Sequence, residues 1–119
     1  MGVFLITKRF DGSYKFAFTS RNGKTIFTSI RYELKEECEK GIDIVKNAIQ
    51  NYGCINFKSA NGKYFFKIVS DNHVLATSRK FSTELLLQNG KDEIHRVAFA
   101  AETLDFSVEN FVFSDVEVI

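Results

Sequence analysis

Two stretches of the chain alternate apolar and polar residues, a pattern typical of strands with one buried face. In residues 14–19 every second residue is aromatic, and in residues 64–69 every second residue is aromatic or Ile. An Asp-Gly pair at 11–12 precedes the first stretch and an Asn-Gly pair at 61–62 precedes the second. Such pairs favour hairpin turns, because Gly and Asn adopt positive φ at low cost. The pattern therefore predicts two strands, each entered from a hairpin.

Further along each half, the hydrophobic period changes to that of an amphipathic helix. Apolar residues recur at helical spacing in residues 34–49 and again in residues 87–101. Gly41 and Gly90 lie inside these two patterns, so we expect a kink or a break at each glycine.

The two halves also match each other in sequence, at a spacing of 50 residues that falls to 49 after a turn. The matched pairs are Gly12/Gly62, Tyr14/Tyr64, Phe16/Phe66, Phe18/Ile68, Ser20/Ser70, Asn22/Asn72, Ile26/Leu75, Thr28/Thr77, Ser29/Ser78, Tyr32/Phe81 and Gly41/Gly90. So many ordered matches indicate a duplication. We expect one domain, residues 1–119, with repeat one at 2–52, repeat two at 53–102 and a C-terminal strand extension at 103–119.

Composition and charge narrow the class of protein. The chain is 45% hydrophobic, with 13 Phe and no Pro, which excludes a disordered or proline-rich protein. With 16 Lys and Arg against 15 Asp and Glu, net charge does not attract it to nucleic acid or to a membrane surface. The sequence shows no signal peptide and no apolar run of about 20 residues, so we expect a cytoplasmic protein with no membrane partner.

The C-terminal residues differ from the rest. Residues 102–119 contain five acidic residues and no Lys or Arg, yet Phe and Val are frequent among them. That apolar content is too high for a solvated acidic tail. Alternation predicts one or two final strands, at 104–108 and 111–118.

Few residues are candidates for catalysis or for metal binding. Cys38 lies on the first helical stripe, and Leu87 takes its place in the second half, which favours packing. Cys54 begins an apolar strand, where a core position is again favoured, although a functional role stays open. His73 and His95 have no partner at the short spacings typical of metal sites. The sequence therefore predicts no catalytic residue, no metal ligand and no cofactor.

One face of the predicted sheet is a weak candidate for binding. If the alternating aromatic residues face the helices, then Lys15, Lys63, Phe65 and Lys67 face away from them. Basic side chains with an aromatic residue on an open sheet are typical of platforms for single-stranded nucleic acid. A solvated face, a face covered by the tail, and a face that binds a partner protein are the alternatives.

Several motifs resemble the YegP-like family of small, mainly bacterial proteins. They are Asp-Gly-x-Tyr-x-Phe-x-Phe at 11–18, Asn-Gly at 22–23, Thr-Ser at 28–29, Tyr32 and Gly-Ile-x-x-Val-Lys at 41–46. The resemblance covers residues 2–50 well and 53–98 more loosely, with His73 and Lys91 departing from the motif.

The resemblance implies an α+β fold. It consists of a tandem repeat of β-β-β-α-β units that form a single antiparallel sheet, with helices packed on it, exchanged C-terminal strands and internal pseudo-twofold symmetry. It implies no chemistry, because the family is a domain of unknown function.

Together, these observations predict an uncharacterised, non-catalytic interaction module with an unknown, possibly protein, partner. Two fused units satisfy their own strand exchange, so we expect a monomer in dilute solution, with pairing through exposed edge strands as the main route to association. The alternatives are a module for single-stranded nucleic acid and, less favoured, a thiol-dependent enzyme around Cys38 or Cys54.

Overall fold

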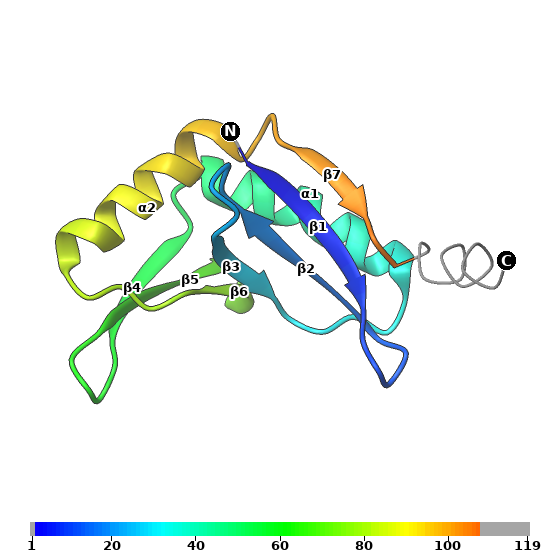
Figure 1. Cartoon of the computed structure of the whole chain (residues 1–119), viewed down its shortest axis with the longest axis horizontal. Helices are drawn as coiled ribbons and strands as arrows, with labels where there is room; N and C mark the ends of the chain where they lie inside the picture. The colour runs from blue at the N-terminus through cyan, green and yellow to red at the C-terminus, as the bar shows by residue number, and fades with distance from the viewer. Residues whose placement is uncertain (1, 108–119) are drawn as a thin grey trace, which may run out of the picture.

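The computed structural model describes residues 2–107 (Figure 1). Its elements are β1 (Val3–Lys8), β2 (Tyr14–Thr19), β3 (Thr25–Ser29), α1 (Lys35–Gln50), β4 (Cys54–Lys58), β5 (Tyr64–Ser70), β6 (His73–Ser78), α2 (Glu84–Val97) and β7 (Glu102–Asp105). The order of three strands and a helix occurs twice, and β7 follows. The protein thus has the α+β architecture expected from its sequence.

All seven strands belong to one sheet, in the order β4-β5-β6-β3-β2-β1-β7. The two halves meet at the centre, where β3 and β6 pair antiparallel. The prediction of a purely antiparallel sheet is wrong at one edge, because β7 runs parallel to β1, from Val3 opposite Glu102 to Ile6 opposite Asp105. The chain reaches β7 through α2 rather than through a hairpin, and a helical crossover allows a strand to enter in the parallel direction.

Each helix is followed by an edge strand of the sheet. β4 follows α1 and pairs with β5, whereas β7 follows α2 and pairs with β1. β7 thus joins the first strand of repeat one, whereas β4 is the first strand of repeat two and pairs inside it. The two edges nevertheless differ: β7 lies outside β1, and no strand in residues 2–107 lies outside β4.

The hydrophobic core lies between the sheet and the helices. Figure 1 shows α1 passing behind β1 and β2, and this helix contacts strands of both halves, β2 and β5. The largest fully buried side chains include Phe4, Phe16, Phe18, Phe27 and Phe66. Burial of each Phe contributes roughly 1.5–3 kcal/mol, so these rings supply much of the energy that holds the helices on the sheet.

Both helices continue through their glycines, so the expected break at Gly41 and Gly90 is wrong. Packing explains these glycines. A Cβ at position 41 would overlap the Tyr32 hydroxyl, and a Cβ at position 90 would lie 3.0 Å from the Phe81 ring. Each glycine lets the aromatic residue after the third strand approach the helix backbone.

Two buried serines occupy matching places in the halves. In the first, the Phe16 N–H donates to Ser29 Oγ at 2.9 Å, and Ser29 Oγ donates to the Ile30 carbonyl at 2.7 Å. Ser78 accepts from the Phe66 N–H and donates to the Arg79 carbonyl at the same distances. The two halves therefore share the hydrogen bonds of their interior as well as their order of elements.

The predicted strand at 104–108 begins earlier than expected, at Glu102, and the one predicted at 111–118 lies outside the described residues. Within residues 2–107, no helix is both long and apolar enough to cross a membrane.

Candidate binding surface at the β4 edge

The face of the sheet opposite the helices presents a mixed row of side chains, one from each strand. In sheet order the row is Leu104, Leu5, Ala17, Thr28, Thr77, Lys67 and Ile55. We call this side of the sheet the open face. It carries the alternate residues that the sequence predicted to face away from the helices.

The structure separates the four residues predicted to form a binding face. Phe65 and Lys67 lie on β5, and Lys63 lies in the turn just before it. Lys15 lies on β2, with β3 and β6 between that strand and β5. Three strand spacings place β2 and β5 about 14 Å apart. Lys15 therefore lies too far away to share a small binding site with Phe65.

The open face holds a group of aromatic and basic side chains at its β4–β5 end. The Phe57 and Phe65 rings stack with centroids 5.4 Å apart and an interplanar angle of 18°. Lys67 Nζ lies 5.2 Å from the Phe57 centroid, and Lys80 Nζ lies 5.9 Å from the Phe65 centroid. We call these four residues the aromatic–lysine cluster. Cation–aromatic contacts of this kind hold lysines close to an apolar surface.

The sequence analysis missed Phe57 and Lys80. Phe57 could have been found by pairing the strands across the Asn61-Gly62 turn, because the observed register sets Phe57 opposite Phe65. Lys80 follows β6, and its position depends on how β6 pairs with β5. No local sequence signal indicates that pairing.

The backbone of β4 is open on one side. The Val69 N–H donates to the Gly53 carbonyl at 2.8 Å. Because antiparallel pairs alternate along a ladder, Ile55 and Phe57 also bond to β5, and Cys54, Asn56 and Lys58 direct their N–H and C=O groups outward. No described strand meets those groups.

The corresponding groups at the other edge are paired. Ile6 holds the position on β1 that Asn56 holds on β4, and its carbonyl accepts from the Phe106 N–H at 2.9 Å. The β4 edge also exposes large apolar side chains, since Ile55 is 49% and Phe57 40% exposed. An edge strand with free backbone groups and exposed apolar side chains readily pairs with another chain.

A hollow of about 410 Å³ lies beside β4 on the helix side of the sheet. Its lining includes Tyr52, Cys54, Gln88, Lys91, His95 and Arg96. The Tyr52 and His95 rings stack with centroids 4.3 Å apart, and Lys91 Nζ donates to Asn56 Oδ1 at 3.0 Å. The hollow therefore has an aromatic wall and basic side chains next to the free edge.

In the first half, β7 and the residues before it occupy the corresponding space between β1 and α1. Lys46 Nζ donates to the Ala101 carbonyl at 3.1 Å, and Lys35 forms an ion pair with Asp105. Lys46 corresponds to His95, which lines the hollow. The hollow beside β4 is thus the counterpart of a space that a strand fills at the other edge.

Both cysteines are free; Cys38 is buried and Cys54 is half-buried. Burial, with nearby Glu39 and Asp105, raises the pKa of Cys38 to about 11. Burial also raises the pKa of Cys54, although Lys91 partly opposes it. Both thiols are therefore protonated at neutral pH, whereas a cysteine nucleophile needs a lowered pKa. His73 is the exposed first residue of β6, with Nδ1 2.9 Å from the Asp71 carbonyl.

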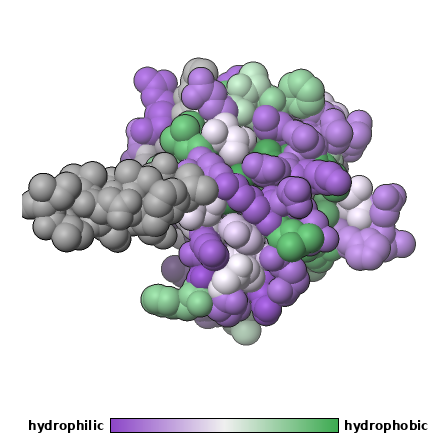
Figure 2. Space-filling view, turned by 90° about the vertical axis from the view of Figure 1, so that its right-hand side faces the viewer, coloured by the Kyte–Doolittle hydropathy of each residue, from purple (hydrophilic) through white to green (hydrophobic). Residues whose placement is uncertain are grey.

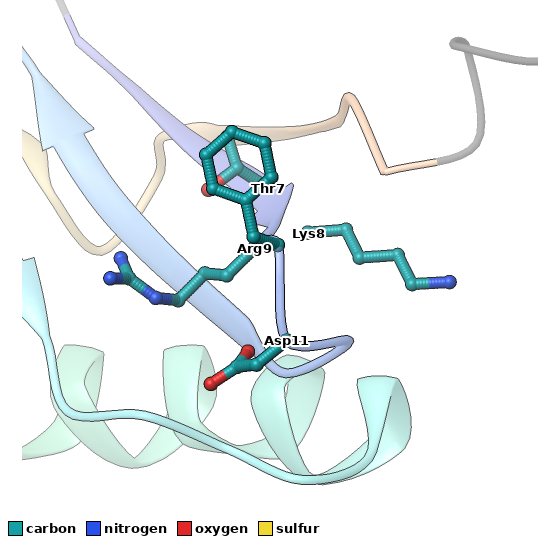
Figure 3. A pocket seen from close by; sticks show the side chains of 5 residues that line it. Thr7, Lys8, Arg9 and Asp11 are labelled. Atoms are coloured by element: carbon teal, nitrogen blue, oxygen red, sulfur yellow. The ribbon is translucent and has the colours of Figure 1, made fainter.

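The β1–β2 hairpin borders another hollow, of about 590 Å³, lined by residues 7–11. Figure 3 shows the Lys8 and Arg9 side chains extending in opposite directions, so they do not converge on a ligand. Asp11 accepts from Ser13 Oγ at 2.6 Å and lies 3.7 Å from Arg31 Nε. Figure 2 shows this end of the molecule as mainly hydrophilic, with hydrophobic residues in small separate groups.

Comparison with known proteins gives the family. Residues 11–51 match the model of a "Domain of unknown function (DUF1508)". The UPF0339 proteins YegP of Escherichia coli K12 and of Shigella flexneri are each 32% identical over 91 residues, which cover 75% of this chain and 83% of theirs.

Two solution structures have the same fold. The protein of unknown function YegP from E. coli is 27% identical, with a TM-score of 0.83 over 90% of this chain and 94% of that one. A UPF0339 protein from Shewanella oneidensis is 23% identical, with a TM-score of 0.84 over 91% of this chain and 93% of that one. The chain therefore belongs to the YegP-like UPF0339 family, a bacterial family of unknown function.

Proposed function

We propose that the protein is a non-catalytic interaction module that binds an extended segment of a polypeptide along β4. The observation that carries this proposal is the row of outward backbone groups at Cys54, Asn56 and Lys58, which no strand in residues 2–107 meets. A strand added to such an edge gains main-chain hydrogen bonds, and its side chains gain contacts on both faces of the sheet.

The charges around the edge define the preferred segment. Lys67 lies on the open face, and Lys91 lies on the helix side, where it reaches Asn56 on β4. Ile55 and Phe57 supply apolar surface on the open face, beside Lys67. A segment that combines apolar and acidic residues complements this edge, because opposite charges favour encounter and set specificity.

Single-stranded nucleic acid is the second candidate ligand, and the aromatic–lysine cluster is the observation in its favour. Base stacking needs free ring faces. Phe57 and Phe65 stack on each other, and lysines lie close to both rings. The protein segment is therefore the better candidate, and nucleic acid is one outcome of the test below.

The remaining parts of the proposal follow from the same features. The raised thiol pKa values of Cys38 and Cys54 support a protein without thiol chemistry. Both cysteines are free, which fits a reducing compartment and supports a cytoplasmic location. The filled β1 edge supports a monomer in dilute solution when no segment occupies β4.

The test is a titration of the isotopically labelled full chain with three probes, followed by backbone amide shifts. The probes are a ten-residue peptide alternating Val and Glu, the same design with Val and Lys, and a ten-nucleotide oligo-dT. We expect the Val/Glu peptide to shift the amides of Cys54, Asn56 and Lys58, and to bind at least tenfold more tightly than the Val/Lys peptide.

A matched pair of variants tests the backbone contact. Asn56→Pro removes one outward N–H at an edge position that tolerates proline, whereas Asn56→Ala removes only the side chain. Peptide binding should be lost in the first and kept in the second. No shift on β4 with any peptide would overturn the proposal. Shifts with oligo-dT at the aromatic–lysine cluster that weaken steeply with salt would favour nucleic acid instead.

A further inference from the structure

We infer that the segment bound along β4 is residues 108–119 of a second copy of this chain. The inference rests on the proposed function and names the occupant of the same edge. It accounts for the unusual composition of these residues, which are acidic and apolar at once.

The length of the segment favours binding to β4 of a second copy rather than to β4 of the same chain. β7 and β4 lie at opposite edges of a seven-stranded sheet, six strand spacings or about 29 Å apart. Twelve fully extended residues span at most about 40 Å. A segment starting beyond residue 107 would use about nine residues to cross the sheet, and about three would remain to pair with β4. A second copy can present the whole segment.

The side-chain pattern of the segment matches the two sides of the β4 edge. In an extended chain, odd-numbered residues 111–117 share one face and even-numbered residues 112–118 share the other. The odd face holds two Phe followed by Asp115 and Glu117. Its rings and carboxylates complement the aromatic–lysine cluster.

The even face of the segment is different: it holds three Val and one Ser. On the helix side of β4 these residues would meet the hollow, where Tyr52 and Cys54 supply apolar surface. The segment carries three acidic residues and no Lys or Arg, whereas Lys58, Lys67 and Lys91 lie on or next to β4. The acidic segment therefore complements the basic edge in charge, and its Val face meets apolar surface on the helix side.

The filled edge of the sheet shows how such a strand is held. β7 pairs in parallel with β1, and its Asp105 forms an ion pair with Lys35 of α1. Each copy carries both a free β4 edge and a segment, so two copies can pair reciprocally and close, or associate head to tail. The single-chain monomer is then the dilute form.

The experiment is sedimentation velocity of the full chain from 5 to 500 µM. We expect reversible, concentration-dependent association. Asn56→Pro should weaken this association at least tenfold, while Asn56→Ala should leave it within twofold. The double variant Asp115→Lys, Glu117→Lys should weaken it similarly, and mixing this variant with Lys67→Glu, Lys80→Glu chains should restore part of it.

A synthetic peptide of residues 108–119 completes the test, with a scrambled peptide of the same composition as control. The native peptide should shift β4 amides and dissociate the assembly, and the scrambled one should not. A monomer at every concentration, or an association insensitive to both sets of variants, overturns the inference. If the Val/Glu peptide binds β4 while the 108–119 peptide does not, this inference fails and the proposed function stands.

Discussion

The two edges of the sheet are built by the same succession of elements, but only one of them is covered by a further strand. At β1, a parallel strand bonds to the outward carbonyl of Ile6 and fills the space beside α1. At β4, the corresponding backbone groups meet no described strand, and the space beside α2 is a hollow. The comparison teaches that an internal exchange of strands satisfies one edge of such a sheet and leaves the other available.

The open faces of the two halves also carry different side chains. The aromatic–lysine cluster of the second half corresponds to Thr7, Lys15, Ala17 and Arg31 in the first. The interiors, by contrast, match at Phe16 and Phe66 and at the two buried serines. The two halves therefore share their buried residues and interior hydrogen bonds and differ in the side chains of their open faces.

Separating the halves should have the largest effect. If the chain is cut after Gly53, each fragment should be unfolded or self-paired, because α1 packs on strands of both halves and a fragment of about 50 residues buries too little surface. Mixing the fragments should restore native-like circular dichroism and a cooperative melt. Cooperative melting of residues 1–53 alone, as a monomer, would show that the halves are independent.

Truncation of the central aromatic residues comes next. Phe16→Ala and Phe66→Ala should each lower the free energy of unfolding by about 3–5 kcal/mol, measured by urea denaturation. Phe16 lies near two rings, Phe4 at 5.9 Å and Tyr32 at 6.1 Å, whereas Phe66 lies near Phe81 at 6.4 Å. The first variant should therefore cost more. Losses below about 1 kcal/mol at both sites would show that Phe16 and Phe66 are not equivalent buried positions of the core.

The buried serines should show a smaller and more equal effect. Ser29→Ala and Ser78→Ala each leave a buried N–H, of Phe16 or Phe66, without its acceptor. We expect each change to cost about 1–3 kcal/mol. The neighbouring exposed residues give matched controls, since Thr28→Ala and Thr77→Ala should stay within about 0.5 kcal/mol. A clear loss in one half alone would break the equivalence of the two interiors.

The smallest effect should come from the ion pair that holds β7. Burial acts to raise the pKa of Asp105, but bonds from Lys35 and Ser107 outweigh it and hold that pKa below its ordinary value. A lowered pKa means that the carboxylate stabilises the fold above about pH 4 and that this contribution is lost as pH falls through the folded-state pKa.

Amide exchange at Phe106 should report this change, because its N–H bonds to Ile6. Protection of this amide, taken relative to the intrinsic exchange rate at each pH, should fall in acid, and Asp105→Asn should show the lower protection already at neutral pH. Amides in the β4–β5 ladder serve as the reference. Equal acid sensitivity at both edges would show that the ion pair does not hold β7.

The parts of the fold that follow local patterns could be predicted from the sequence. Alternation in residues 14–19 and 64–69 and the helical spacing after them located the strands and helices, because both depend on near neighbours. The direction of β7 depends on its pairing with a strand about 100 residues earlier, and nothing local signals it. Gly41 and Gly90 were interpreted as helix breakers, although their role is set by Tyr32 and Phe81 across the core.

The candidate site was only partly predictable for the same reason. Phe65 and Lys67 follow from alternation within one strand. Phe57 joins them through the hairpin register, and Lys80 through the pairing of β6 with β5. The free edge of β4 is a property of the whole sheet order, and it could be recognised only when β7 was located beside β1.

The pairing of β1 with β7 also means that the β1 edge stays uncovered for much of the time during which the chain is synthesised. β1 leaves the ribosome about 100 residues before its outer partner β7. At about 5–20 residues per second, this strand waits roughly 5–20 seconds before its edge is covered. During that interval, each nascent chain has an uncovered strand at both ends of the growing sheet. Crowding of neighbouring ribosomes on one message is therefore the moment of greatest risk for misassociation of this protein.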